Sequence, residues 1–126
     1  MPATEQANTM RSCFMIGKSQ AARTSARLLL EELGFSVGEF SSGRDAHESY
    51  MQLFPSTLLV DTCMLDDPDL CRILADIENY DLSDRPVIVV YGELNVSPKF
   101  DMDLGDFKRV AEPFNKRNFM NIFGAV

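Results

Sequence analysis

Short apolar runs alternate along this chain with stretches in which apolar residues recur at helical spacing. The clearest run, Pro-Val-Ile-Val-Val at residues 86–90, has no polar face, which is typical of a strand buried on both sides of a parallel sheet. The clearest helical face carries Leu70, Ile73, Leu74 and Ile77. Because parallel strands are joined by crossover segments, which are usually helices, this alternation favours an α/β fold.

The same patterns predict a single doubly wound parallel sheet, in which five strands alternate with five helices through right-handed crossovers. Strands are expected at residues 13–16, 36–40, 58–61, 86–90 and 108–111. The first helix is expected between Ser19, a candidate N-cap, and Gly34, a candidate left-handed C-cap. The other helices are expected at residues 43–51, 70–77, 95–104 and 115–123. Pro98 interrupts the helical pattern of the fourth.

The charge balance excludes several classes of partner. The chain has 19 acidic and 12 basic residues, a net charge of -7 and a pI near 4.6. Nucleic acid and anionic lipid bind basic surfaces, so neither is an expected partner. No apolar run approaches the roughly 18 residues that suggest a membrane span, and residues 1–10 lack the blocks of a signal peptide. A protein partner or a small ligand is favoured instead.

The length of the chain fits one self-sufficient domain. We expect this domain at residues 11–126, preceded by a disordered tail at residues 1–10. The three cysteines, Cys13, Cys63 and Cys71, form no Cys-x-x-Cys pair and lie on otherwise apolar segments. This usage predicts reduced thiols that serve packing, and a cytoplasmic location.

Asp61 is the strongest single candidate for a functional residue. It ends the apolar run at residues 58–60 and so lies at the carboxyl end of a predicted buried strand. In open α/β sheets, ligands bind at the carboxyl ends of the strands. An acid at this position therefore predicts a site, provided that its neighbours support one.

Four motifs, in order along residues 12–126, resemble the receiver domain of two-component response regulators. They are Met-Ile-Gly-Lys-Ser at 15–19, Phe-Pro-(x)5-Asp-Thr-Cys-Met at 54–64, Pro-(x)4-Tyr-Gly at 86–92 and Glu-Pro-Phe at 112–114. The resemblance implies a flavodoxin-like (βα)5 fold and a role in phosphorelay signal transduction. It also implies that Asp61 occupies the phosphoacceptor position.

The chain departs from the resembled family at the metal-binding positions. Receivers end their first strand with two acids that, together with the phosphoacceptor, hold Mg²⁺, whereas this chain has Gly17 and Lys18 there. Mg²⁺ is usually anchored by carboxylate oxygens, and a glycine beside an ammonium supplies none. We therefore expect no metal and no cofactor.

Three further departures surround the position that the resemblance assigns to the phosphoryl group. Tyr91 replaces a smaller hydroxyl residue, and its length should misplace any donor. Glu112 replaces the lysine that pairs with the phosphoryl group, and Arg109 replaces an aromatic residue and could stack on Tyr91. Phosphoryl transfer depends on charge neutralisation and positioning, which these replacements remove. No residue is therefore assigned a catalytic role.

Lys18 has two alternative roles. Its ammonium could lie where the metal ion would sit and pair with Asp61, Glu112 or both, in a closed ion cluster that fixes one conformation. Alternatively, it points into water. A third hypothesis, nucleotide hydrolysis by a P-loop at residues 17–19, is disfavoured because the motif needs a glycine where the chain has Ser12.

These observations favour a stand-alone, degenerate pseudo-receiver that binds other proteins independently of phosphorylation and is not an enzyme. The alternative is a response regulator that accepts phosphate on Asp61 from a histidine kinase or a phosphotransfer protein. In both cases the expected partner is a signalling protein, which is a histidine kinase, a phosphotransfer protein or a downstream effector.

The resemblance also predicts where a partner binds. Receivers generally signal through their fourth helix, fifth strand and fifth helix, which places the expected interface at residues 95–123. Phe114, Phe119, Met120 and Phe123 crowd this segment, and we expect part of their surface to stay exposed. The last helix is also a candidate contact for a weak homodimer.

Overall fold

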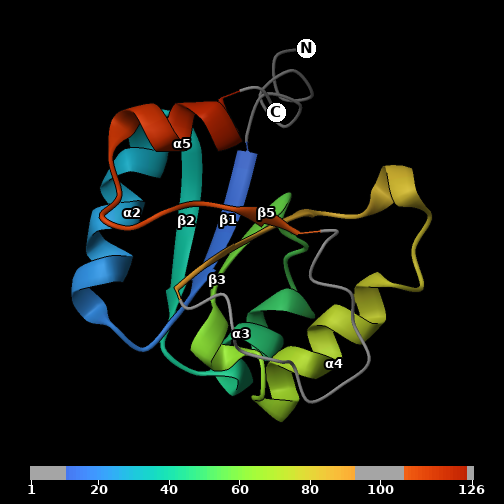
Figure 1. Cartoon of the computed structure of the whole chain (residues 1–126). Helices are drawn as coiled ribbons and strands as arrows, with labels where there is room; N and C mark the ends of the chain where they lie inside the picture. Colours follow the sequence, from blue (N-terminus) through green and yellow to red (C-terminus); the bar gives the residue numbers. More distant parts are fainter. Residues whose placement is uncertain (1–10, 93–106, 125–126) are drawn as a thin grey trace.

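The computed structural model describes residues 11–92 and 107–124. These residues form one five-stranded sheet with the strand order β2-β1-β3-β4-β5 (Figure 1). The strands are β1 (Arg11–Ile16), β2 (Phe35–Phe40), β3 (Thr57–Asp61), β4 (Val87–Tyr91) and β5 (Lys108–Arg109). All neighbouring strands run parallel. The predicted doubly wound α/β fold is confirmed.

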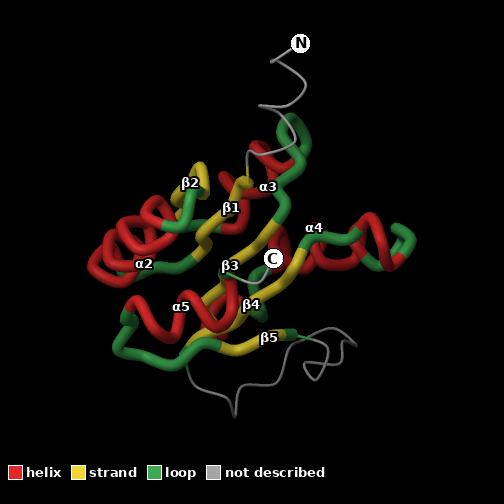
Figure 2. Tube along the Cα trace, turned by 90° about the horizontal axis from the view of Figure 1, so that it is seen from above, coloured by secondary structure: helices red, strands yellow, loops and turns green. Residues whose placement is uncertain are grey.

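Helices cover both faces of this sheet (Figure 2). Helices α2 (Gln20–Glu32) and α5 (Lys116–Phe123) lie on one face, and α3 (Gly43–Tyr50) and α4 (Pro68–Ile77) lie on the other. Two short 3-10 helices, η1 (Thr62–Met64) and η2 (Leu82–Asp84), follow β3 and α4. None of the described helices is long and apolar enough to cross a membrane. The tail expected at residues 1–10 and the helix expected at 95–104 lie outside the described residues.

The strand order positions the site. The chain leaves β1 toward β2 on one side and later returns to β3 on the other side, so the topology switches between β1 and β3. At such a switch point the crossover helices leave in opposite directions, and a crevice opens at the carboxyl ends of the two strands. Residue 17, which follows β1, and Asp61, the last residue of β3, border this crevice.

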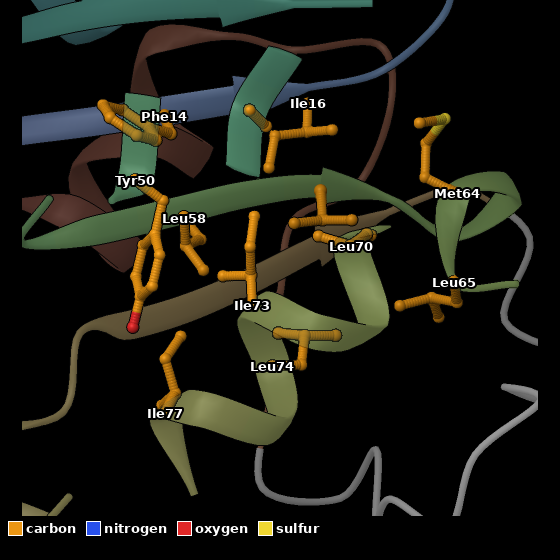
Figure 3. Packing of buried hydrophobic residues seen from close by; sticks show 12 residues of the cluster. Phe14, Ile16, Tyr50, Leu58, Met64, Leu65, Leu70, Ile73, Leu74 and Ile77 are labelled. Atoms are coloured by element: carbon orange, nitrogen blue, oxygen red, sulfur yellow. The ribbon is translucent and has the colours of Figure 1, made fainter. Parts of the chain in front are cut away.

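Two apolar cores hold the layers together. The core under α3 and α4 joins side chains from β1, β3 and both helices, which point toward one another in Figure 3. All four residues of the predicted helical face, Leu70, Ile73, Leu74 and Ile77, are buried in it. The other core packs α2 and α5 against the opposite face of the sheet and includes Phe119 and Phe123.

The helix ends follow from local chemistry. The hydroxyl of Ser19 accepts a hydrogen bond from the backbone N–H of Ala22, and Gly34 has a φ of 92° just after the end of α2, so both predicted caps are confirmed. Asp67 caps α4 in the same way as Ser19 caps α2, with Oδ1 accepting from the N–H groups of Asp69 and Leu70.

Two sequence-based expectations about the fold need correction. Strand β5 comprises only Lys108–Arg109 instead of residues 108–111, because pairing with β4 reaches only these two residues. Of the cysteines, which we expected to be packing thiols, only Cys13 is buried. Cys63 is exposed and Cys71 is half-buried.

Candidate functional site

Asp61 lies at the carboxyl end of β3, as predicted, and is half-buried. It is in register with Tyr91, the last residue of β4. Its Oδ1 accepts a hydrogen bond of 3.0 Å from the backbone N–H of Cys63, so the side chain caps the short helix η1. One carboxylate oxygen is therefore already engaged by the protein itself.

Gly17 and Tyr91 fit each other across the crevice. Gly17 is buried directly after β1. A Cβ atom at this position would overlap the hydroxyl oxygen of Tyr91 and would lie 3.4 Å from the Cβ of Asp61. The phenol of Tyr91, whose side chain is only 1% exposed, thus occupies the space that a side chain at position 17 would need. The glycine is what allows the tyrosine to point into the crevice.

The hydroxyl of Tyr91 is buried among negative charges. It has no hydrogen-bond partner within residues 11–92 and 107–124. Burial raises the pKa of this phenol well above its ordinary value, and the negative charges of Asp61 and Glu112 raise it further, whereas Arg23 opposes the shift. The phenol therefore stays protonated at neutral pH. Because both carboxylates raise this pKa, both lie close enough to the hydroxyl for their charges to act on it.

Gly92 brings the backbone close to the Asp61 carboxylate. It has a φ of 103°, which non-glycine residues rarely adopt. A Cβ atom there would lie 2.9 Å from Oδ1 of Asp61 and 2.8 Å from Oγ1 of Thr62. Gly92 itself thus lies directly against the acid. The glycine directly after an apolar strand was the sequence signal for this close approach.

Sequence reasoning missed Arg23 as a residue of the site. This arginine of α2 donates a 2.6 Å hydrogen bond to the carbonyl oxygen of Gly17 and forms a 3.4 Å ion pair with Glu39 at the end of β2. Its side chain is 14% exposed. Arg27, one turn later, pairs with the same Glu39 at 2.7 Å. The i,i+4 spacing of the two arginines was a signal that they share one face of α2.

Lys18 does not form the closed ion cluster that was one of its two alternatives. It is exposed, and no ion pair joins it to Asp61 or Glu112 in the described part of the chain. An exposed ammonium keeps its hydration, whereas burying it would carry a desolvation cost. The water-facing alternative is the one observed.

Arg109 and Glu112 are both exposed. The expected stacking of Arg109 on Tyr91 is not observed, since the cation–ring contact found among the described residues joins Arg11 and Phe35. The ring partner of Tyr91 is Phe114, with centroids 5.1 Å apart in an edge arrangement. Phe114 in turn contacts Phe119 of α5 at the same centroid distance. Tyr91 is therefore held by the aromatic core and leaves Arg109 free to face solvent.

The described residues do not fit the Mg²⁺ ion that receivers hold. They contain no group of three side chains of the His, Cys, Asp and Glu types that could ligate a metal ion. Position 17 has no side chain, and the neutral phenol of Tyr91 fills the space beside it. A single carboxylate next to a phenol is a poor set of ligands for a hard cation. No chemical step through a metal can be derived for this site.

The thiol of Cys63 lies beside Asp61 and is a weak nucleophile at neutral pH. Although the residue is exposed, partial desolvation of the thiol by neighbouring protein atoms is the largest cause that raises its pKa, to about 11, and a hydrogen bond to the Asp61 side chain and the negative charge of that side chain add to the shift. The thiolate, which is the nucleophilic form, is therefore scarce at neutral pH. The thiol adds no nucleophile to the crevice.

Comparison with known proteins identifies the fold. No protein-family model and no curated protein matches this chain. Among solved structures, a CheY-like receiver domain from Methylobacillus flagellatus is 18% identical, with a TM-score of 0.71, and the match covers 92% of this chain and 98% of that one. The chemotaxis response regulator CheY4 of Vibrio cholerae is 15% identical with a TM-score of 0.66, covering 93% and 98%.

A third similar structure is part of a longer protein. A variant of the anti-anti-sigma factor PhyR from Bartonella quintana is 16% identical with a TM-score of 0.64, and the match covers 95% of this chain but 50% of that protein. Identities this low establish the fold alone. The chain thus has the fold of response regulator receiver domains, as the sequence motifs predicted.

Proposed function

We propose that this chain is a degenerate receiver that acts as a phosphorylation-independent protein-interaction module in signal transduction, and that it is not an enzyme. The observation that carries the proposal is the phenol of Tyr91, which fills the space over Gly17 where a receiver would place a metal-binding acid. The fold of its structural neighbours supports the signalling context. A histidine kinase, a phosphotransfer protein or a downstream effector is the expected kind of partner.

Electrostatics argues against phosphate at this site. Transfer to an aspartate creates a dianionic group, which receivers balance with a metal ion and a lysine. Here Glu112 stands at the lysine position, and its negative charge reaches the hydroxyl of Tyr91 at the centre of the crevice. Arg23, which lies against Gly17, is already engaged by Glu39 and the Gly17 carbonyl. Lys18, whose positive charge reaches the Cys63 thiol beside Asp61, is exposed and hydrated, so the described residues offer no unengaged buried cation to neutralise a phosphoryl group.

The second candidate function is phosphate acceptance on Asp61. It is favoured by one observation, because Asp61 keeps the acceptor position at the end of β3 and is only half-buried. In that case the kinase or phosphotransfer protein would have to add positive charge to that of the exposed Lys18 and the engaged Arg23.

Beryllofluoride with Mg²⁺ separates the two functions, because it mimics an aspartyl phosphate only where the site can hold both. We expect no saturable change in amide NMR shifts near Asp61, Tyr91 and Glu112. Asp61→Asn serves as the control, since any shift that persists in it comes from Mg²⁺ elsewhere. Saturable shifts at the site that disappear in Asp61→Asn would establish the second candidate and reject the first.

A further inference from the structure

A cluster of large apolar side chains stays exposed at the end of the sheet opposite to Asp61. It contains five of the seven large apolar side chains that are exposed among the described residues. They come from the segments after α3 and after α4 and are Met51, Leu53, Phe54, Tyr80 and Leu82. These five residues are called the amino-end surface below. Strand β3 separates them from Asp61 by about 16 Å, taking about 3.3 Å for each of its five residues.

Ring contacts and hydrogen bonds order this surface. Phe54 lies between Tyr50 and Tyr80, with centroid distances of 5.4 and 5.2 Å. The hydroxyls of Tyr50 and Tyr80 both donate to Oδ2 of Asp76, at 2.6 and 3.1 Å. Phe54 and Tyr80 are therefore held against each other and against α4, so these two side chains need little ordering when a partner binds.

A hollow adjoins the aromatic side chains. A pocket of about 320 Å³ lies beside Phe54 and is lined by Pro55, Pro86 and Arg85, among others. The short helix η2, gold in Figure 1, projects from the body of the molecule next to it. Leu82 in this helix is 81% exposed. A pocket beside projecting apolar side chains can receive a large side chain of a partner.

The rim of the amino-end surface is acidic. Glu78, Asp81 and Asp84 are exposed and form no ion pair within the described residues. The nearby guanidinium of Arg85 donates to the carbonyl oxygens of Glu78 and Tyr80, at 2.8 and 3.0 Å, and so is directed to the backbone. A bound segment would therefore meet apolar side chains surrounded by unpaired negative charge.

We propose that the amino-end surface docks a segment of a partner protein that carries large apolar side chains beside lysine or arginine. Apolar contact would supply the affinity, and the carboxylates would select basic neighbours. The chain's own residues 1–10 are a poor occupant, because they include Glu5 and no lysine or arginine. A second copy would bring the same carboxylates together, on a chain whose net charge is -7.

The experiment uses a designed helical peptide with leucine on one face and lysine on the other, and a matched peptide with glutamate in place of lysine. We expect the lysine peptide to bind, to shift the amide signals of Leu53, Tyr80 and Leu82, and to weaken as salt is raised. Leu82→Ser should weaken binding about tenfold. Leu28→Ser, which removes another exposed leucine, on α2 at the far side of the sheet, should leave it unchanged.

Charge is tested separately. Asp81→Asn with Asp84→Asn should weaken the lysine peptide, whereas Asp45→Asn with Glu48→Gln, which removes two charges from α3, should not. Equal binding of the glutamate peptide, or no effect of Leu82→Ser, would overturn the proposal. So would a dimer in solution that is lost in Leu82→Ser, because the occupant would then be a second copy.

This inference rests on the proposed role in protein interaction, but it can fail independently of it. Beryllofluoride tests the crevice at Asp61, and the peptides test the opposite end of the sheet. If beryllofluoride bound at Asp61 and the lysine peptide still bound, the proposal of phosphorylation independence would be rejected. The proposal of the amino-end surface would stand.

Discussion

The missing side chain at position 17 and the large phenol at position 91 together decide the chemistry of the crevice. Gly17 contributes no carboxylate, and Tyr91 contributes a phenol that points into the vacated space. Either change alone would be unfavourable, because an acid would collide with the ring and a small hydroxyl residue would leave a cavity beside the glycine. The two residues therefore form one structural unit.

A double-mutant cycle tests this unit. Gly17→Ala should lower the free energy of unfolding by about 1–3 kcal/mol, because the new methyl group overlaps the Tyr91 hydroxyl. In a Tyr91→Ala background the same change should cost much less, giving a coupling of at least about 1 kcal/mol in urea unfolding. Gly38→Ala, whose methyl group would meet the Phe40 ring instead, should be additive with Tyr91→Ala. Additivity in the Gly17 cycle would contradict the contact.

The unpartnered hydroxyl of Tyr91 predicts an unusual substitution. Tyr91→Phe removes a buried polar group that has no hydrogen-bond partner in the described structure, so the free energy of unfolding should stay constant or rise by about 1 kcal/mol. Tyr50→Phe is the matched control. Its hydroxyl donates to the Asp76 carboxylate at 2.6 Å, and its loss should cost about 1–2 kcal/mol. Equal losses in both variants would show that the Tyr91 hydroxyl has a partner.

At the scale of elements, a single glycine sets how closely α3 and α4 approach. A Cβ atom at Gly43, the first residue of α3, would lie 2.7 Å from the carboxylate carbon of Asp67 and 2.8 Å from the backbone nitrogen of Leu70. Asp67 is the cap of α4. The first turns of the two helices therefore meet at an atom-to-atom contact that leaves no room for a methyl group.

Gly43→Ala should consequently destabilise the protein by about 1–2 kcal/mol, since the clash with a backbone atom outweighs the better helix propensity of alanine. Arg44→Ala, at the next position of α3, should change stability by less than about 0.5 kcal/mol, because that side chain is 80% exposed. Urea unfolding of the two variants provides the comparison. A stabilised Gly43→Ala protein would mean that α4 can move away without cost.

Helix α5 and the residues before it divide their apolar side chains between the core and the surface. Phe119 and Phe123 are fully buried, Phe114 is half-buried against Tyr91, and only Met120 remains exposed, at 50%. Part of this apolar surface is exposed, as expected, and the rest belongs to the core. The partner surface and the weak homodimer expected there remain predictions, and residues 95–106 of the expected interface lie outside the described structure.

At the scale of the whole molecule, a thiol and two phenols with raised pKa values predict that the protein loses stability at alkaline pH. Burial raises the pKa of the Cys13 thiol from 9.0 to about 12, and the pKa values of the Tyr50 and Tyr91 phenols are raised as well, with burial as the largest cause. The unfolded chain releases these protons at lower pH than the native protein does. The stability that they contribute is present below pH 9 and is lost as pH rises toward the native pKa values.

Urea unfolding between about pH 8 and 11 should therefore show a falling free energy of unfolding, with each group contributing at most about 1.4 kcal/mol per pH unit. Tyr91→Phe should fall less steeply above pH 10, because it lacks one of these groups. Stability that stayed constant to pH 11 would contradict the burial of these side chains.

The sequence by itself determined the elements of this protein. The apolar runs, the helical face of residues 70–77, and the caps at Ser19 and Gly34 are all recovered, because each depends on interactions within a few residues. The position of Asp61 followed in the same way, since the end of a parallel strand defines the edge at which sites form.

Only the tertiary structure decided how the residues at that edge meet. Tyr91 packs on Phe114 and over Gly17, Arg23 reaches the Gly17 carbonyl, and Lys18 turns to solvent. These contacts join residues that are far apart in sequence or compete for the same space, so they depend on strand register and on the volume left by neighbouring side chains. Local patterns carry no information about that volume.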